Sequence, residues 1–596
     1  MTDHFEVHER DGTARLGELR LDEPVFTPAL VDLIDAETGP DGFVRGILDD
    51  AGSYWRRDRE IPSGAGDRLT ILPHRAFPPG TEPEVMDAFD PEVRALDAPS
   101  AAVISPETAR NHGTDAYVLS GGPALEGHAE AFVDAVIRTR EAIPADSALL
   151  LSNAATPANV ATLGYAGVDL VDPGKAIAEG TRGHYLTQHG MRFLDDLAEL
   201  PCACPACEGG VEHFDRTDCV EHNVRELAAA VATTRERIRR GRLRDYLEGQ
   251  ARHEPWLTAA LRRLDDRWGY LEPRTPIVRT ARIAATTDDT LRRVEIRRFA
   301  DRVTSRYRCR FDGPLALVPC SATKPYSESP SHRQFRRVID YRAHLASMTS
   351  PIGVVPQELE LTYPAQHYDT AVTGRWSETE VEFVSEVLRR YLERTAYPRV
   401  IAHVPDDYRE ITERVEDAVD VPFEYTVSGH PTGEESLDAL SDALAGERRY
   451  QMRERQHNTL RAIADWQFGD GAGDELLPEG LRIQSRYPKL RAHDADDEQL
   501  AAMVPEYGTL ALTLAGARRW VDSDAPTMRV EIDSFVPHGS VLAPGVVDAD
   551  EVIRPGDEVV VEGPAAFGVG RAAMSGPEMA ESTRGIAVDV RHVEER

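Results

Sequence analysis

Short apolar runs alternate with amphipathic stretches over the first half of the chain. Residues 147–153 (SALLLSN) and 167–173 (GVDLVDP) are apolar runs ended by turn-forming residues, a pattern typical of buried parallel strands. Residues 124–143 carry apolar side chains at helical spacing, and residues 222–250 predict one long amphipathic helix with arginines on its polar face. This order predicts βα repeats over residues 1–275, which can close into a barrel.

A second α/β region is predicted after a boundary rich in proline, arginine and threonine near residues 272–290. Within residues 290–445, the runs 313–320 (GPLALVPC) and 398–405 (PRVIAHVP) predict buried strands, and residues 378–395 predict a helix between them. Loops that follow the carboxyl ends of such strands are where α/β folds place their functional sites.

Two smaller regions follow. Residues 450–525 include a charged, glycine-rich run, and we expect a small α+β linker domain there. Residues 527–596 are short strands punctuated by glycine and proline, which predicts a small β-barrel. No run of about 18 apolar residues occurs, and the first residues lack the basic and apolar parts of a secretory signal. We therefore expect a cytoplasmic α/β protein with no membrane contact.

The charge pattern predicts a protein from a salt-rich cytoplasm. The 596-residue chain has a formal net charge of −34, and the acidic residues are spread along its whole length. Only three of its 68 basic residues are lysines, namely Lys175, Lys324 and Lys489. High salt shortens the range of charge interactions to a few ångströms, so the net charge does not exclude an RNA partner. A lysine retained against this bias is expected to do something that arginine cannot, such as lose its proton.

A cluster of cysteines predicts a metal site. Cys202, Cys204 and Cys207 lie within six residues, and His222 follows on the predicted helix. Three thiolates and one imidazole form a tetrahedral set that suits zinc, and four protein ligands leave no open position, so the zinc would be structural. Cys219 is an alternative fourth ligand. Cys309 and Cys320 stand apart, and in a cytosolic protein we do not expect a disulfide framework.

The loop after the predicted strand 313–320 concentrates reactive side chains. It carries a thiol, an amine, a phenol, a hydroxyl and an imidazole, from Cys320, Lys324, Tyr326, Ser329 and His332. Two prolines within the loop restrict its backbone. The alternative interpretation is a polar loop around a structural cysteine.

The metal-site pattern resembles that of tRNA-guanine transglycosylases, in which Cys-x-Cys-x-x-Cys precedes a helical His-Asn. The segment 163–187 is similar to the part of those enzymes that carries their nucleophilic aspartate, with Asp172 at the matching position. The resemblance implies a TIM barrel over residues 1–275. The family also has an aspartate before a Ser-Gly-Gly run, where this chain has Leu119. We therefore expect Asp172 to bind substrate, and the alternative is that it only shapes a turn.

The loop itself resembles the signature of the archaeosine synthase family, Pro-Cys-x3-Lys-Pro-Tyr-x2-Ser-x2-His, at every position. Residues 363–376 are similar to the central domain of that family, and residues 527–596 resemble its RNA-binding PUA domain. The resemblance covers the whole chain, and a halophilic archaeal source would also account for the composition. It implies action on tRNA that carries 7-cyano-7-deazaguanine (preQ0) at position 15 of the D-loop. Lysine or another nitrogen donor would be added to the nitrile, a radical-SAM partner enzyme would act next, and a homodimer is possible.

The residue chemistry fits such a reaction. We expect the Cys320 thiolate to attack the nitrile carbon and the incoming amine to displace it, with Lys324 stabilising the sulfur or donating a proton. His332 is the expected proton shuttle, and Tyr326 and Ser329 would orient a substrate. In a rival assignment, Lys324 only binds the substrate carboxylate. The alternative functions are a transglycosylase that uses Asp172 and a non-catalytic subunit that docks tRNA.

Overall fold

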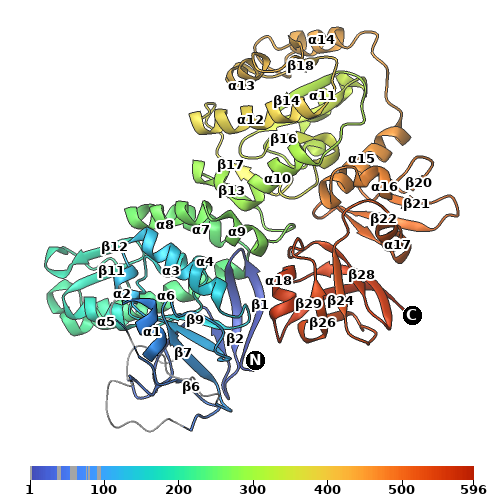
Figure 1. The fold of residues 1–596 in the computed structure, drawn as a ribbon. Coiled ribbons are helices and arrows are strands. Elements are labelled where there is room, and N and C mark those ends of the chain that lie inside the picture. The colour runs from blue at the N-terminus through green and yellow to red at the C-terminus, as the bar shows by residue number, and fades with distance from the viewer. Residues whose placement is uncertain (1–2, 37–41, 54–62, 76, 78–80, 90–95) are drawn as a thin grey trace. The chain divides into compact units, whose positions relative to one another are not determined.

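The computed structural model describes residues 3–36, 42–53, 63–75, 77, 81–89 and 96–596, and the chain divides into two compact units (Figure 1). Unit 1 comprises Met1–Thr275 with Leu542–Val546 and Met574–Ala587, and unit 2 comprises the remaining residues. Among the helices of the described ranges, none has both the length and the apolar composition that a membrane span requires.

A closed parallel barrel forms the centre of unit 1. In the described residues seven strands follow each other around the barrel in chain order, and the last pairs with the first. They are β4 (Ala29–Leu33), β5 (Arg45–Asp50), β6 (Leu69–Ile71), β7 (Ser100–Ile104), β8 (Ala116–Leu119), β9 (Ala148–Leu151) and β10 (Leu170–Val171). Apolar side chains of these strands fill the core, which confirms the barrel prediction.

The helices around this barrel differ from the predicted ones at two places. The region 124–143 overlaps the end of α2 (Gly122–Leu125) and contains α3 (Ala129–Ala142). The prediction of a single long helix over 222–250 is wrong, because the chain forms two helices there, α6 (Arg216–Arg239) and α7 (Leu243–Gln250). Gly241 lies between α6 and α7 with φ of +61°, a conformation that glycine adopts without steric cost and that ends a helix.

Unit 2 contains a five-stranded sheet with the order β16-β15-β14-β18-β19. Its strands are β14 (Leu315–Pro319), β15 (His344–Thr349), β16 (Gly353–Pro356), β18 (Val400–Ala402) and β19 (Phe423–Tyr425). All neighbours are parallel except β15 and β16. The main helices of this domain are α10 (Val294–Ser305), α11 (Pro330–Ile339), α12 (Glu378–Arg394), α13 (Asp406–Glu416) and α14 (Glu434–Ala443). The strands and the helix predicted here are therefore present.

A separate ribbon of two strands also belongs to unit 2. The strand β13 (Ile283–Ala285) pairs in parallel with β17 (Tyr368–Thr370). The pairing joins two segments that are far apart in the sequence, because Ile283 lies opposite Tyr368. This ribbon bears on the site because Tyr368 contacts the side chain of Lys324.

The last two regions each form a sheet. An antiparallel sheet combines β20 (Arg482–Gln484), β21 (Arg491–His493), β22 (Gln499–Val504) and β23 (Thr509–Leu512), accompanied by α15 (Met452–Phe468), α16 (Ala472–Leu476) and α17 (Leu514–Asp522). The final sheet has the order β25-β29-β28-β27-β24-β26. Its strands are β24 (Arg529–Ile532), β25 (Ser540–Leu542), β26 (Val546–Ala549), β27 (Glu558–Glu562), β28 (Ala566–Ala572) and β29 (Ile586–Glu595).

Candidate functional site

Cys320 lies at the carboxyl end of the central strand of the unit 2 sheet. It directly follows β14, and its backbone N–H still donates to the carbonyl of Met348 on β15 at 3.1 Å. The side chain is half-buried, so its sulfur is not sealed in the apolar core. This is the edge at which parallel sheets collect functional loops.

One hydroxyl contacts the Cys320 sulfur, and one ammonium group interacts with its charge. The hydroxyl of Tyr408 lies 3.3 Å from Sγ. The charge of a Cys320 thiolate is also felt by Lys324, whose ammonium nitrogen lies 3.8 Å from the centre of the Tyr368 ring. Burial lowers the pKa of Lys324, and the thiolate opposes this change only in part. Lys324 is therefore closer than a surface lysine to releasing its proton at neutral pH.

A buried network of hydroxyl groups lies beneath the loop. The hydroxyls of Tyr326 and Tyr368 lie 2.5 Å apart, and the Thr349 hydroxyl lies 2.7 Å from that of Tyr368. Ser329 is also buried, and its hydroxyl donates to that of Ser321 at 2.7 Å. The Ser329 bond joins two points of the loop, and the Tyr326 bond ties the loop to β17, so both predicted substrate-orienting hydroxyls have partners within the protein.

His332 is fully buried on the inner side of the loop. Its Nε2–H donates to the carbonyl of Pro319 at 3.0 Å, and its ring stacks on Tyr326 with centroids 4.9 Å apart. A carbonyl can only accept, so Nε2 carries the proton and Nδ1 has the lone pair. Burial lowers the pKa of His332 to about 4. The imidazole is thus neutral at pH 7 and holds the residue that precedes Cys320.

This burial predicts an acid-sensitive domain. Between pH 6.5 and 4 the unfolded chain binds a proton at His332 that the folded chain does not, so stability is lost as the pH falls through this range. We expect a loss of about 3 kcal/mol, measured by denaturant unfolding at each pH. His332→Gln should show a flatter pH profile, whereas the exposed His430→Gln should keep the wild-type profile. Identical profiles for wild type and His332→Gln would contradict this assignment.

The sequence prediction missed Tyr408 and Trp376. Tyr408 is on α13, which begins just after β18, the strand next to β14. Trp376 packs edge-on against the Tyr408 ring, with centroids 4.8 Å apart. The segment after the predicted strand 398–405 carried a usable signal, because loops after neighbouring parallel strands meet at one edge.

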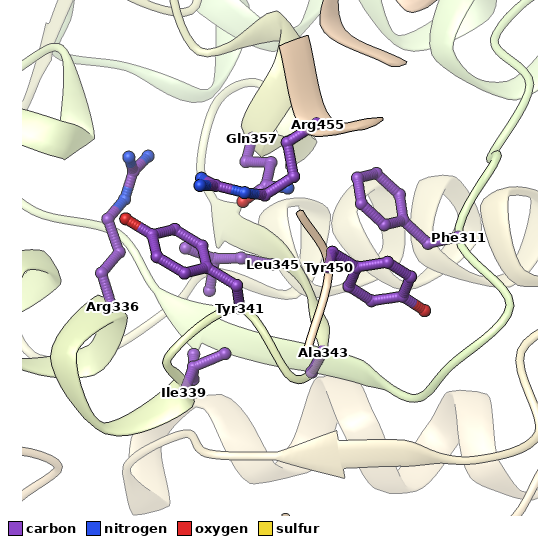
Figure 2. A pocket seen from close by; sticks show the side chains of 9 residues that line it. All are labelled: Phe311, Arg336, Ile339, Tyr341, Ala343, Leu345, Gln357, Tyr450 and Arg455. Atoms are coloured by element: carbon purple, nitrogen blue, oxygen red, sulfur yellow. The ribbon is translucent and has the colours of Figure 1, made fainter. Parts of the chain in front are cut away.

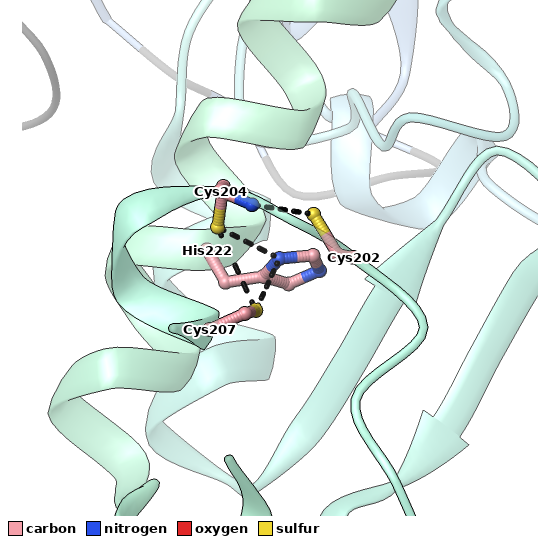
Figure 3. Close-up of side chains that lie close together, drawn as sticks. All are labelled: Cys202, Cys204, Cys207 and His222. Carbon is pink, nitrogen blue, oxygen red and sulfur yellow. Dashed lines mark hydrogen bonds between the residues drawn. The ribbon is translucent and has the colours of Figure 1, made fainter. Parts of the chain in front are cut away.

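The predicted metal ligands come together in unit 1 (Figure 3). One ligand atom from each of Cys202, Cys204, Cys207 and His222 lies within 4.8 Å of all the others. His222 Nδ1 lies 3.6 Å from the Cys204 sulfur and 3.5 Å from the Cys207 sulfur, while Nε2–H donates to the Leu186 carbonyl at 2.9 Å. That bond sets the tautomer in which Nδ1 can ligate a metal. The cluster could therefore hold a metal ion.

Cys219 is not part of this cluster. Its thiol donates to the carbonyl of His184 at 3.4 Å, and burial raises its pKa to about 11. The alternative fourth ligand is therefore absent from the described cluster. Tyr185, next to His184, stacks on the His222 ring at a centroid distance of 3.8 Å and holds the imidazole from one face.

Asp172 directly follows β10 at the carboxyl end of the barrel. Its two carboxylate oxygens accept backbone N–H bonds from Asn153 at 2.9 Å and from Gly174 at 2.8 Å. Burial nevertheless raises the pKa of Asp172. Leu119 is buried at the end of β8 and supplies no second carboxylate.

Two cavities lie away from these residues. In unit 1, a cavity of about 390 Å³ is lined in part by Lys175, which forms ion pairs with Glu126 at 2.6 Å and Glu179 at 3.1 Å. Figure 2 shows a smaller cavity of about 70 Å³ in unit 2, where Arg455 lies over the Tyr341 ring at 3.4 Å. Neither cavity is lined by Cys320, Lys324 or Asp172.

Family comparisons agree with this arrangement. Four family models match the chain: "Queuine tRNA-ribosyltransferase" over 99–255, a domain of unknown function (DUF5591) over 296–444, the "patch-forming domain C2 of tRNA-guanine transglycosylase" over 458–526 and the PUA domain over 529–593. The Cys320 loop thus lies in the domain whose family model has no stated function.

Named relatives indicate the class of enzyme more closely than the family models do. An archaeosine synthase of Haloferax volcanii is 58% identical, and an archaeosine synthase subunit alpha of Methanosarcina acetivorans is 40% identical, each over 100% of both chains. A tRNA-guanine(15) transglycosylase of Methanothermobacter thermautotrophicus is 28% identical over 77% of this chain and 68% of the relative. The barrel, the cysteine–histidine cluster and the PUA domain define a tRNA-modifying enzyme of the transglycosylase type.

Within that class, the chain belongs to the archaeosine synthase family. It is an enzyme of tRNA modification in archaeosine biosynthesis. Haloferax volcanii is a halophile, which agrees with the source predicted from the composition.

Proposed function

We propose that the enzyme adds an amine to the nitrile of preQ0 at position 15 of tRNA through a thioimidate on Cys320. The observation that carries the proposal is the half-buried Cys320 at the carboxyl end of β14, in the same loop as Lys324, whose pKa is lowered by burial. A nitrile carbon reacts poorly with water but well with a thiolate.

The first step forms the carbon–sulfur bond. The thiolate attacks the nitrile carbon, one carbon–nitrogen π bond breaks, and its electron pair takes a proton from the Lys324 ammonium group. In the second step an amine, lysine or another nitrogen donor, attacks the thioimidate carbon. The carbon–sulfur bond breaks, the thiolate returns, and neutral Lys324 takes the extra proton of the amine. The product is an amidine, on which a radical-SAM partner would act.

The remaining predicted residues take supporting roles in this proposal. Tyr326 and Ser329 fix the loop through their hydroxyl bonds. His332 positions Cys320 through the Pro319 carbonyl, and we assign it this role in place of proton transfer, because it is fully buried. Asp172 would bind the substrate at the barrel mouth. Zinc would occupy the cysteine–histidine cluster as a structural ion, since all four ligands come from the protein.

The deciding experiment supplies preQ0-bearing tRNA with isotope-labelled lysine and identifies the nucleoside product by mass spectrometry. The expected product has the mass of preQ0 nucleoside plus lysine and contains the label. Guanine-bearing tRNA with free preQ0 forms the second arm. Incorporation of preQ0 there, with no labelled product in the first arm, would favour the transglycosylase alternative. No product in either arm would favour the docking subunit.

Replacing Lys324 separates its two candidate roles. Lys324→Arg keeps the positive charge, but a guanidinium group does not release its proton at neutral pH. If Lys324 transfers protons, we expect kcat to fall by about 100-fold or more with little change in the KM for lysine. If it only binds the substrate carboxylate, the arginine should preserve kcat. Lys489→Arg is the matched control, because Lys489 is exposed and lies between β20 and β21, outside the Cys320 loop.

A further inference from the structure

The hydroxyl of Tyr408 is placed against the sulfur by the packing of α13. Tyr408, Ile411, Thr412 and Val415 form the buried face of this helix at spacings of three and four residues. Asp406 and Asp407 in its first turn favour a helix start at this point. Because β18 lies beside β14, the first buried residue of α13 reaches the loop after β14.

The direction of the Tyr408 hydrogen bond follows from its surroundings. The side chain is only 8% exposed, and burial together with the neighbouring Cys320 thiolate raises its pKa. The phenol therefore keeps its proton at neutral pH. A thiolate can only accept, so at 3.3 Å the Tyr408 hydroxyl donates to the Cys320 sulfur when that sulfur is ionised.

We propose that Tyr408 is a further catalytic residue, whose hydroxyl stabilises the Cys320 thiolate by a direct hydrogen bond. The inference rests on the proposed function. Tyr408 stabilises negative charge on the Cys320 sulfur at two stages of the reaction. In the free enzyme the bond increases the fraction of sulfur that is ionised. When the amine displaces sulfur, the electron pair of the breaking carbon–sulfur bond stays on Sγ. The Tyr408 hydroxyl then stabilises this leaving thiolate by the same hydrogen bond. No proton leaves Tyr408 in either step.

Trp376 positions the phenol. It precedes α12 and meets the Tyr408 ring edge-on, with an interplanar angle of 80°. This contact limits the tilt of the phenol ring and thereby the direction of its hydroxyl. Trp376 is half-buried, so it can be replaced without opening the sheet core. It is a positioning residue, because it acts on the sulfur through Tyr408.

The test measures the ionisation of Cys320 without substrate. The full chain is treated with iodoacetamide over a range of pH, and the alkylated Cys320 peptide is quantified by mass spectrometry. In Tyr408→Phe, which keeps the ring and its packing, we expect the midpoint of alkylation to rise by about one pH unit. Alkylation near pH 7 then falls about tenfold. Trp376→Leu should give a smaller change in the same direction.

Tyr425→Phe is the matched control. It also loses a phenol hydroxyl in this domain, but that hydroxyl donates to Glu416 and not to sulfur. Its alkylation curve should equal the wild-type curve. If Tyr408→Phe also leaves the curve unchanged, the inference about Tyr408 is overturned, whatever the role of Cys320.

Turnover provides the second readout. For Tyr408→Phe we expect the rate near pH 7 to fall at least tenfold and to recover partly as the pH rises, because more sulfur ionises without help. A rate that falls equally at every pH would overturn the effect of Tyr408 on the ionisation of Cys320 in the free enzyme. Full activity of a Cys320→Ser enzyme would instead overturn the proposed function, and the alkylation curves would still report the hydrogen bond.

Discussion

Cys320→Ser is expected to lower the turnover of preQ0-bearing tRNA by roughly four orders of magnitude or more, because the variant lacks the attacking group. A serine hydroxyl in the same place stays protonated near neutral pH and cannot form the thioimidate. The rate is measured by mass spectrometry of the nucleosides, and tRNA affinity is measured separately. The affinity should remain within a few-fold of wild type, since the change is one atom in a half-buried side chain.

Two observations complete that test. Without an amine, the wild-type protein should accumulate a covalent tRNA adduct, which the serine variant should not form. Cys309→Ser is the matched control, because Cys309 precedes β14 and lies at the other end of that strand. It should keep both turnover and adduct formation. A Cys320→Ser enzyme with normal turnover would remove the thioimidate from the mechanism.

Loss of the zinc ion that we propose for the cysteine–histidine cluster is expected to have the second large effect, on folding. A structural zinc ion contributes about 10–16 kcal/mol of binding free energy, which is comparable to the total stability of a typical domain. Cys204→Ser or prolonged chelation should therefore release about one zinc ion per chain and unfold the segment around the cluster. The measurements are metal analysis and limited proteolysis between β12 (Gly190–Phe193) and α6.

Cys219→Ser tests whether Cys219 or His222 is the fourth ligand of the proposed zinc site. Cys219 is buried and bonded to the His184 carbonyl, away from the cluster. We expect this variant to keep its zinc, with a modest loss of stability from placing a hydroxyl in a buried thiol site. Zinc loss in Cys219→Ser, together with retention in His222→Ala, would show that the fourth ligand is Cys219 and would contradict our assignment.

Much of the fold could be predicted from local patterns. The apolar run 313–320 contains β14, and the helical spacing in 378–395 agrees with α12, because buried elements of this kind need particular periodicities. The clustering of the cysteines with His222 could also be predicted, since Cys202, Cys204 and Cys207 lie on one tight loop. The break at Gly241 was missed, because the apolar periodicity continues across a glycine that a helix can tolerate.

The sequence by itself determined which groups could react: a cysteine, a lysine and an imidazole in one loop after a strand. Only the tertiary structure decided what each of them contacts. His332 is turned inward to the Pro319 carbonyl, and the hydroxyl that hydrogen-bonds to the Cys320 sulfur comes from Tyr408, 88 residues further along the chain. Such contacts depend on which strands are neighbours in the sheet and on which helix face packs inward. Spacing along the chain does not record either of these choices.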